Sequence, residues 1–311
     1  MIELRIYSAN QKEEWDDLIR RSKIDSFLFF RDFMDYHSHR FQDLSFLIYR
    51  KSKLVAVLPG NLDANIYYSH QGLTYGGIVT TTKLVLIEVI EIFSKLNEIL
   101  REKGVSEVIY KPTPHIYHNA PAEEDLYVLF LLNAQRVCCN ISSTIYQKNR
   151  IPFIESRKSG IRKAKLNGIE VNELKDYYKF WELLNKNLGG KYKTAAVHSL
   201  SEIENLKNYF PDNIKLYGAL INEEIIAGAL LFLMKNIVHV QYISATERGK
   251  ELGALDLIFE KLLNDFYPDK PIFDFGQSTE KNGKYLNENL IFQKEGFGGR
   301  GIVYDVFSYR I

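Results

Sequence analysis

The sequence predicts a mixed α/β protein made of two tandem domains, residues 1–150 and 151–311, with a cleft between them. Its length of 311 residues suits about two domains of ordinary size. The order of strands and helices predicted for the first half recurs in the second half. Between the halves lies a polar, basic segment, residues 148–167, which is typical of a crossing between two domains.

The sequence of the first half predicts a strand, two helices and three antiparallel strands, followed by a helix, a strand, a second helix and a last strand. Strands are indicated by short runs that alternate or are rich in branched and aromatic residues. The longest helix is indicated by apolar residues that recur at helical spacing. The elements are expected, in order, at residues 2–7, 11–22, 31–40, 44–50, 53–61, 66–70, 82–102, 105–112, 122–132 and 135–147.

The second half predicts the same order of elements. Tight turns, "NEE" and "KN", join its three consecutive strands, and one long helix carries a broad apolar face. The elements are expected at residues 168–174, 175–188, 199–209, 214–221, 224–234, 237–244, 250–267, 271–276, 284–293 and 301–309. The repeated order predicts a duplicated architecture, although the two halves share no detailed sequence identity.

The charge balance limits the kind of partner. Lys and Arg number 40 against 39 Asp and Glu, so the net charge is +1. Proteins that depend on contacts with a nucleic-acid backbone usually carry a basic excess. We therefore expect no DNA partner, the charge does not support a tRNA partner, and any anion site must be local.

The cysteines and the apolar runs narrow the class further. Cys138 and Cys139 are adjacent, so in a strand they point to opposite faces and cannot hold a metal together. The longest apolar runs, 226–234 and 127–132, are too short to span a bilayer. The N-terminal residues alternate like a strand and do not resemble a signal peptide. We expect a cytoplasmic protein with no integral membrane segment and no metal site.

Two stretches carry a resemblance to a known family. The segment 273–299 reads "FDFG", then a short linker, then "NENLIFQKEGFGG", and residues 159–171 read "SGIRKAKLNGIEV". Both are similar to segments of the Fem-type peptidyltransferases, tandem-GNAT enzymes that add amino acids to cell-wall precursors. The resemblance implies an acyltransferase that uses acyl-CoA or aminoacyl-tRNA as a co-substrate and needs no metal or redox cofactor. Residues 175–213 are long enough for only two ordinary helices, so the helical hairpin of some family members is not expected.

The GNAT layout implies a donor site where the fourth strand meets the next helix. In the second half this junction is "ATERGKELGA", which supplies Arg248, Gly249, Gly253 and Ala254 as candidates to bind the cofactor. Backbone N–H groups and the helix dipole favour an anion at such a place. The segment keeps the residue types of the GNAT diphosphate loop but not their spacing. The alternative interpretation is an ordinary capped helix start.

Three residues are candidates for catalysis. His70 and Tyr75 lie in a Gly-rich segment, 69–82, where the backbone could approach the acceptor closely. The resemblance places Lys294 beside the reacting carbonyl, where its charge would stabilise an oxyanion. Phe297 would shape the loop around that lysine. The alternatives are a structural histidine and a solvated helix-end lysine.

A basic cluster, Arg157, Arg162 and Lys163, could bind a phosphate on a nucleotide- or lipid-linked acceptor, or could be a solvated face. Taken together, the sequence predicts an N-acyltransferase acting on an amine of a cell-wall or surface-polysaccharide precursor. The alternative is a non-catalytic protein on the same scaffold that binds a glycan or a peptide.

Overall fold

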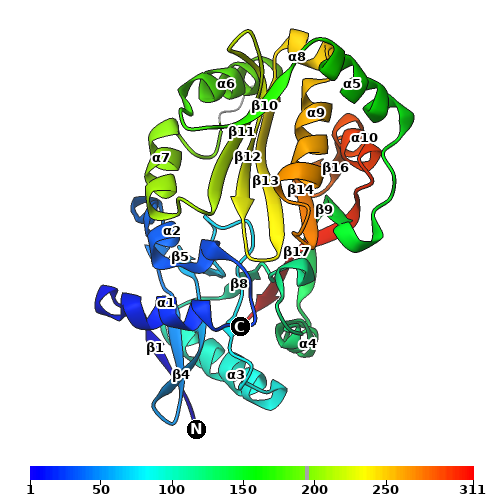
Figure 1. Ribbon diagram of the computed structural model, residues 1–311. Coiled ribbons are helices and arrows are strands. Elements are labelled where there is room, and N and C mark those ends of the chain that lie inside the picture. The colour runs from blue at the N-terminus through cyan, green and yellow to red at the C-terminus, as the bar shows by residue number, and fades with distance from the viewer. Residues whose placement is uncertain (193–195) are drawn as a thin grey trace. The chain divides into compact units, whose positions relative to one another are not determined.

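The computed structural model describes residues 1–192 and 196–311 (Figure 1). The chain forms two compact units. Unit 1 consists of residues 1–141, 279–285 and 303–311, and unit 2 consists of residues 142–278 and 286–302. The predicted class, a mixed α/β protein, is confirmed by the sheets and helices of both units.

The units differ from contiguous halves in three places. Residues 142–150 belong to unit 2, whereas residues 279–285 and 303–311 belong to unit 1. Two long strands, β9 (Gln135–Tyr146) and β17 (Arg300–Arg310), each contribute residues to both units. The boundary predicted at residue 150 treated the last strand as part of the second half, because the pattern of elements does not show which strands pair.

Unit 1 contains an antiparallel sheet in the order β1-β3-β4-β7 and a second group of strands. In the second group β17 pairs antiparallel with β8, β8 parallel with β6, and β6 antiparallel with β5, which also pairs with β2. The strands are β1 (Ile2–Ile6), β2 (Gln42–Asp43), β3 (Phe46–Arg50), β4 (Lys53–Leu58), β5 (Asn61–Asp63), β6 (Ile66–Tyr68), β7 (Val79–Thr80) and β8 (Glu107–Tyr110). The helices are α1 (Lys12–Arg20), α2 (Arg31–Asp35), α3 (Leu86–Glu102) and α4 (Glu124–Leu131).

The three consecutive strands predicted for the first half are arranged differently. The strand expected at 53–61 is split into β4 and β5 by Pro59 and Gly60. Proline cannot donate a ladder hydrogen bond, and a side chain at Gly60 would lie 2.0 Å from the Tyr67 hydroxyl. The chain therefore leaves one sheet and enters the other, where β6 pairs with β5 and β8 instead of with β4.

Unit 2 is built on a sheet in which β10, β11, β12 and β13 form an antiparallel meander. Next to β13 lies β14, paired in parallel, and next to β14 lies the unit 2 part of β9, paired antiparallel. The strands are β10 (Glu170–Leu174), β11 (Ile214–Ile221), β12 (Glu224–Leu233), β13 (Ile237–Ala245) and β14 (Ile272–Gln277). The short strands β15 (Thr279–Glu280) and β16 (Tyr285–Leu286) form a separate two-stranded sheet after β14, and residues 279–285 of this segment belong to unit 1.

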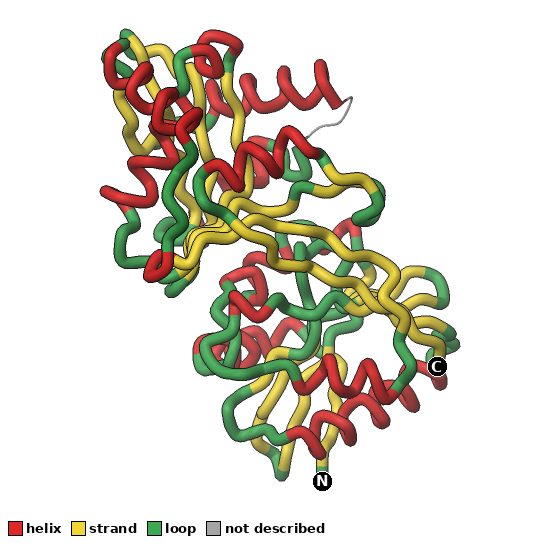
Figure 2. Tube along the Cα trace, turned by 90° about the vertical axis from the view of Figure 1, so that its right-hand side faces the viewer, coloured by secondary structure: helices red, strands yellow, loops and turns green. Residues whose placement is uncertain are grey.

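Helices cover both faces of this sheet (Figures 1 and 2). Phe180 of α6 packs against Gly228 on one face of β12. The neighbouring residues Ala227 and Ala229 point to the other face and share a core with Leu257 of α9. The helices are α5 (Glu155–Leu166), α6 (Tyr178–Tyr192), α7 (Leu200–Tyr209), α8 (Glu247–Glu251), α9 (Ala254–Lys261) and α10 (Glu288–Gly296). No helix among the described residues is both long and apolar enough to cross a membrane.

Two glycines let α5 pack against the start of α9. Gly253, at φ +72°, precedes α9, and a Cβ there would lie 2.4–2.7 Å from backbone atoms of Gly160 in α5. A Cβ at Gly160 would in turn lie 1.9 Å from a carboxylate oxygen of Asp256. The backbone of α5 therefore covers the first turn of α9.

We expect Gly253→Ala to lower the free energy of unfolding by roughly 2–4 kcal/mol, because it adds a backbone clash to the left-handed strain. Gly168→Ala is the matched control, since Gly168 has φ +66° but nothing within 4 Å of its Cβ position. That variant should lose only about 1–2 kcal/mol. Urea unfolding of both variants measures the difference. Equal losses in the free energy of unfolding would show that α5 can move away from a side chain at residue 253 at no energetic cost.

Candidate functional site

The parallel strands β13 and β14 of unit 2 share only three residue pairs. The pairing begins with Ile237 and Ile272 and ends with His239 and Asp274. Beyond that pair β13 continues to Ala245 and β14 to Gln277, and these described segments share no further register. Three polar side chains, His239, Asp274 and Lys294, gather where the two strands stop pairing.

Asp274 is fully buried and holds three hydrogen-bond donors. Its Oδ1 accepts from the hydroxyls of Ser142 and Thr144, the second at 2.8 Å, and its Oδ2 lies 2.8 Å from Nδ1 of His239. Ser142 and Thr144 are two residues apart on β9, so both point to the same face beside β14. A buried carboxylate is stable only with such partners, and this set fixes its position.

The Asp274 carboxylate in turn orients the imidazole of His239. Since an ionised carboxylate only accepts, Nδ1 of His239 donates to it and Nε2 is the basic nitrogen. A buried carboxylate that fixes the tautomer of a histidine is the arrangement found in acyl-transfer sites. In the neutral ring this hydrogen bond therefore places the proton on Nδ1 and the lone pair on Nε2.

Lys294 is buried beside the same strands, with only 5% of its surface exposed. It lies in the last turn of α10, and its Nζ donates to the carbonyls of Gly276 and Gln277 at 2.8 and 2.7 Å. Burial lowers the pKa of the Lys294 ammonium to about 8, and the nearby Asp274 partly offsets that effect. The alternative interpretation, a solvated helix-end lysine, is wrong because the side chain turns into the protein.

Gly276 connects the histidine with the lysine. It has φ +74°, a conformation that side chains rarely adopt, and it presents its carbonyl to Lys294. A Cβ at this position would lie 3.5 Å from Cε1 and 3.9 Å from Nε2 of His239. The glycine therefore leaves room at the edge of the imidazole that carries its basic nitrogen.

Comparison with known proteins gives a match in structure only. No protein-family model matches the chain, and no curated protein matches it. The solved structure of FemX matches with a TM-score of 0.70 and 11% identity, over 99% of this chain and 97% of that one. L-PGS from Bacillus licheniformis matches with a TM-score of 0.63 and 9% identity, over 96% and 91%. A tandem GNAT protein from the clavulanic acid biosynthesis pathway matches with 0.53 and 10%, over 100% and 98%.

Alignments of nearly full length on both sides decide the fold. The chain has the fold of FemX and of the tandem GNAT protein. At the level of the fold, the predicted resemblance is thereby confirmed. In unit 2, β13 and β14 are the fourth and fifth strands counted from β10. The predicted donor junction begins at Ala245, at the end of β13, six residues after His239.

The residues of the predicted donor junction are engaged in packing contacts. Gly249 is buried, and a Cβ there would lie 2.2 Å from the carbonyl of Ile226. Gly253 and Ala254, at the start of α9, are buried under α5, while Arg248 is exposed on α8. Thr246 caps α8 by accepting from the Gly249 N–H at 2.9 Å. These contacts explain both glycines, and cofactor binding by the four residues stays a prediction.

The predicted catalytic residues of unit 1, His70 and Tyr75, lie in different surroundings. His70 packs against His37 and Phe41, and burial together with His37 lowers its pKa to about 3. A base that weak takes up few protons near neutral pH. Tyr75 is 2% exposed, because its ring packs against Tyr117 and its hydroxyl hydrogen bonds with Ser26 at 2.8 Å. The two side chains thus contact different sets of residues.

The predicted substrate-binding residues do not form one cluster. Arg157 turns inward, where its guanidinium lies 2.8 Å from Asp256 and over the ring of Phe297. Phe297 is fully buried in the core of unit 2, and Lys163 is exposed on α5. Arg162, by contrast, lines a pocket. The prediction of a shared phosphate site by Arg157, Arg162 and Lys163 is therefore not supported by their placement.

The sequence analysis missed His239 and gave Asp274 no role. His239 lies in a strand of mostly apolar residues, and Asp274 lies inside the "FDFG" segment that carried the resemblance. One feature of the sequence could have indicated the site. Polar residues, including the run "SST" at 142–144, occur within strands at positions that the structure buries. Only the pairing of β9, β13 and β14 brings these residues together.

Proposed function

We propose that this protein transfers an acyl or aminoacyl group from an activated donor to an amine. The observation that carries the proposal is the meeting of His239, Asp274 and Lys294 where β13 and β14 separate. It places a basic nitrogen, held by a buried carboxylate, near a buried ammonium. Those are the two groups that the attack of an amine on a carbonyl requires.

In the proposed reaction the amine nitrogen attacks the carbonyl carbon of the donor. Nε2 of His239 takes the proton that the amine loses, and Asp274 stabilises the resulting imidazolium. Lys294 has three N–H donors and uses two on Gly276 and Gln277, so the third can face the oxyanion. When the intermediate collapses, the bond to the leaving group breaks, and that thiolate or alkoxide takes the proton from His239.

The donor is acyl-CoA or aminoacyl-tRNA, and the packing of α5 over the start of α9 favours the second. The diphosphate of CoA would need the backbone N–H groups of that helix start, which the backbone of Gly160 covers. The acceptor in this proposal is an amine on a cell-wall or surface-polysaccharide precursor. With a net charge of +1, contacts with tRNA would be local.

A transfer assay tests the proposal. The protein is incubated with labelled aminoacyl-tRNAs or acyl-CoAs and a panel of amino sugars and cell-wall peptides, and mass spectrometry detects the amide product. A thermal-shift screen of the same compounds selects the panel, because a ligand that binds the folded state raises Tm. Product with one donor class supports the proposal. Stabilisation by a glycan or peptide with no transfer from either donor would favour the alternative of a non-catalytic binding protein.

A further inference from the structure

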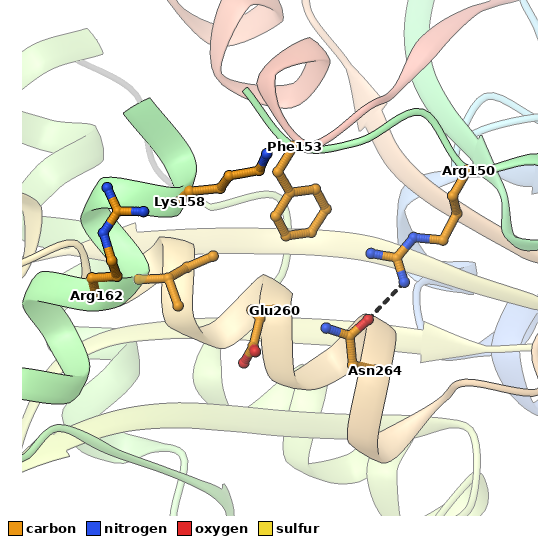
Figure 3. Close-up of a pocket in the computed structure, with 7 residues that line it drawn as sticks. Arg150, Phe153, Lys158, Arg162, Glu260 and Asn264 are labelled. Atoms are coloured by element: carbon orange, nitrogen blue, oxygen red, sulfur yellow. Dashed lines mark hydrogen bonds between the residues drawn. The ribbon is translucent and has the colours of Figure 1, made fainter. Parts of the chain in front are cut away.

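Unit 2 contains a pocket that the proposed reaction does not use. It has a volume of about 360 Å³ and lies between the segment before α5, α5 itself and the end of α9. Figure 3 shows Arg150 at one end, Lys158 and Arg162 at the other, and the ring of Phe153 between them. Its lining is completed by Ile161, Glu260 and Asn264. The volume is near the lower end of the roughly 300–1,000 Å³ typical of small-molecule sites.

Positive charge is concentrated in this pocket. Three cations line it against one carboxylate, although the chain as a whole carries a net charge of only +1. Arg150 is held in place, since its Nη1 donates to Oδ1 of Asn264 at 2.7 Å and its guanidinium lies over the ring of Phe153. Burial lowers the pKa of Arg150, which means that its charge has lost water. A partly dehydrated guanidinium gains from an anion with two acceptor oxygens.

The carboxylate of Glu260 indicates a second group that a ligand of this pocket should carry. Its Oε1 accepts from Nζ of Lys165 at 3.0 Å, so a cation outside the pocket balances much of its charge. Its Oε2 is buried and has no hydrogen-bond partner among the described residues. A buried acceptor without a donor is costly, and turning the carboxylate toward the pocket would let the hydroxyl of a ligand donate to this oxygen.

We propose that this pocket binds a small organic phosphate that also carries a hydroxyl, as a sugar phosphate or a nucleotide does. Arg150 and Lys158 hold the phosphate oxygens, Glu260 accepts from the hydroxyl, and Phe153 with Ile161 contacts the apolar face of the ring. Arg162 can join them, because its ion pair with Glu155 is exposed and contributes little. The site is separate in its residues from the cluster of His239, Asp274 and Lys294.

Isothermal titration calorimetry of the full chain tests this, with glucose 1-phosphate, UDP and inorganic phosphate as probes. We expect Lys158→Gln and Arg150→Gln each to weaken binding of an organic phosphate by about tenfold, the usual loss for one charge-assisted contact. The side chain of Lys158 is exposed, and among the described residues its other interaction is an electrostatic one with the exposed Glu155, so its variant should fold normally. The matched control is Lys179→Gln, an exposed lysine of α6 outside the pocket, which should bind like the wild type.

Glu260→Gln separates the hydroxyl contact from the phosphate contact. We expect it to strengthen binding of inorganic phosphate, because a negative charge is removed, and to reduce the advantage of glucose 1-phosphate over inorganic phosphate. Tighter binding of UDP than of glucose 1-phosphate identifies a nucleotide, and the reverse identifies a sugar phosphate. The proposal is overturned if no probe binds the folded wild type, or if the pocket variants and Lys179→Gln bind alike. It is also overturned if the pocket variants weaken binding of an RNA oligonucleotide only.

Discussion

Replacing Lys294 by Met is expected to lower turnover by roughly a hundredfold or more, while KM for both substrates stays near the wild-type value. The ammonium would contact the oxyanion, which exists in the transition state and not in the bound substrates. Methionine keeps much of the apolar stem that packs in the last turn of α10. Steady-state kinetics with the donor and acceptor found by the transfer assay measures both constants.

Three outcomes of this variant are distinguishable. Loss of turnover alone supports the oxyanion role. A rise in KM alone would mean that Lys294 binds substrate charge, and no change in either constant would mean that it only holds the carbonyls of Gly276 and Gln277. The control is Lys179→Gln, which changes an exposed lysine of α6 in the same unit, outside both the proposed site and the pocket.

The pH dependence of the wild type should report the same group. Because the pKa of Lys294 is lowered to about 8, turnover should fall as the pH rises through about 8. Lys294→Arg should remove that fall, since arginine stays charged.

The free energy of unfolding should change with pH in the opposite direction. Below about pH 8 the folded protein bears the full cost of the buried charge, and that cost is relieved between pH 8 and the ordinary lysine pKa near 10.5. Urea unfolding should show the wild type gaining stability over that window relative to Lys294→Met.

Replacing His239 by Gln is expected to lower turnover by roughly 10²–10⁴, the usual contribution of a general base. Glutamine keeps a hydrogen-bonding side chain next to Asp274 but cannot take up a proton. Asp274→Asn should act through the histidine, because an amide can present a donor to Nδ1 and so favour the wrong tautomer. The same kinetic assay, with Tm recorded for each variant, compares them.

A matched control for this pair is His118→Gln, which changes a partly buried histidine of unit 1 that hydrogen bonds with the carbonyl of Thr113. It should leave turnover unchanged. If His239→Gln retains wild-type turnover with an unchanged Tm, another group or the substrate itself removes the proton. If Asp274→Asn alone loses activity, the carboxylate acts without the histidine and the proposed pairing is wrong.

The sequence predicted most elements of unit 2, because its strands and helices have clear periodicity and short turns between them. The three strands expected at 214–221, 224–234 and 237–244 match β11, β12 and β13 within two residues. In unit 1 the break at Pro59 and Gly60 was missed, since a proline near the end of a strand also fits a turn. The sequence analysis also did not show that β9 and β17 each contribute residues to both units, because the pairing of strands depends on the tertiary structure.

For the candidate site, the sequence indicated Lys294 through a resemblance and gave no sign of its burial. Its surroundings depend on the left-handed turn at Gly276, whose carbonyl faces α10 only after the chain has folded. His239 and Asp274 are 35 residues apart in the sequence. They become neighbours only through the register in which β13 pairs with β14. The catalytic roles of Lys294, His70 and Tyr75 stay predictions.

The membership of residues 303–311 in unit 1 has a consequence for synthesis of the protein on the ribosome. Domains usually fold as units, the N-terminal one first, while the chain is still growing. Here β8 needs Phe307 through Arg310 as its antiparallel partner, and the buried ring of Tyr309 belongs to the core of unit 1. Unit 1 therefore cannot be completed until residues 303–311 have been translated, and until then β8 lacks this partner strand. Cutting the chain at residue 150 would leave the N-terminal fragment without it.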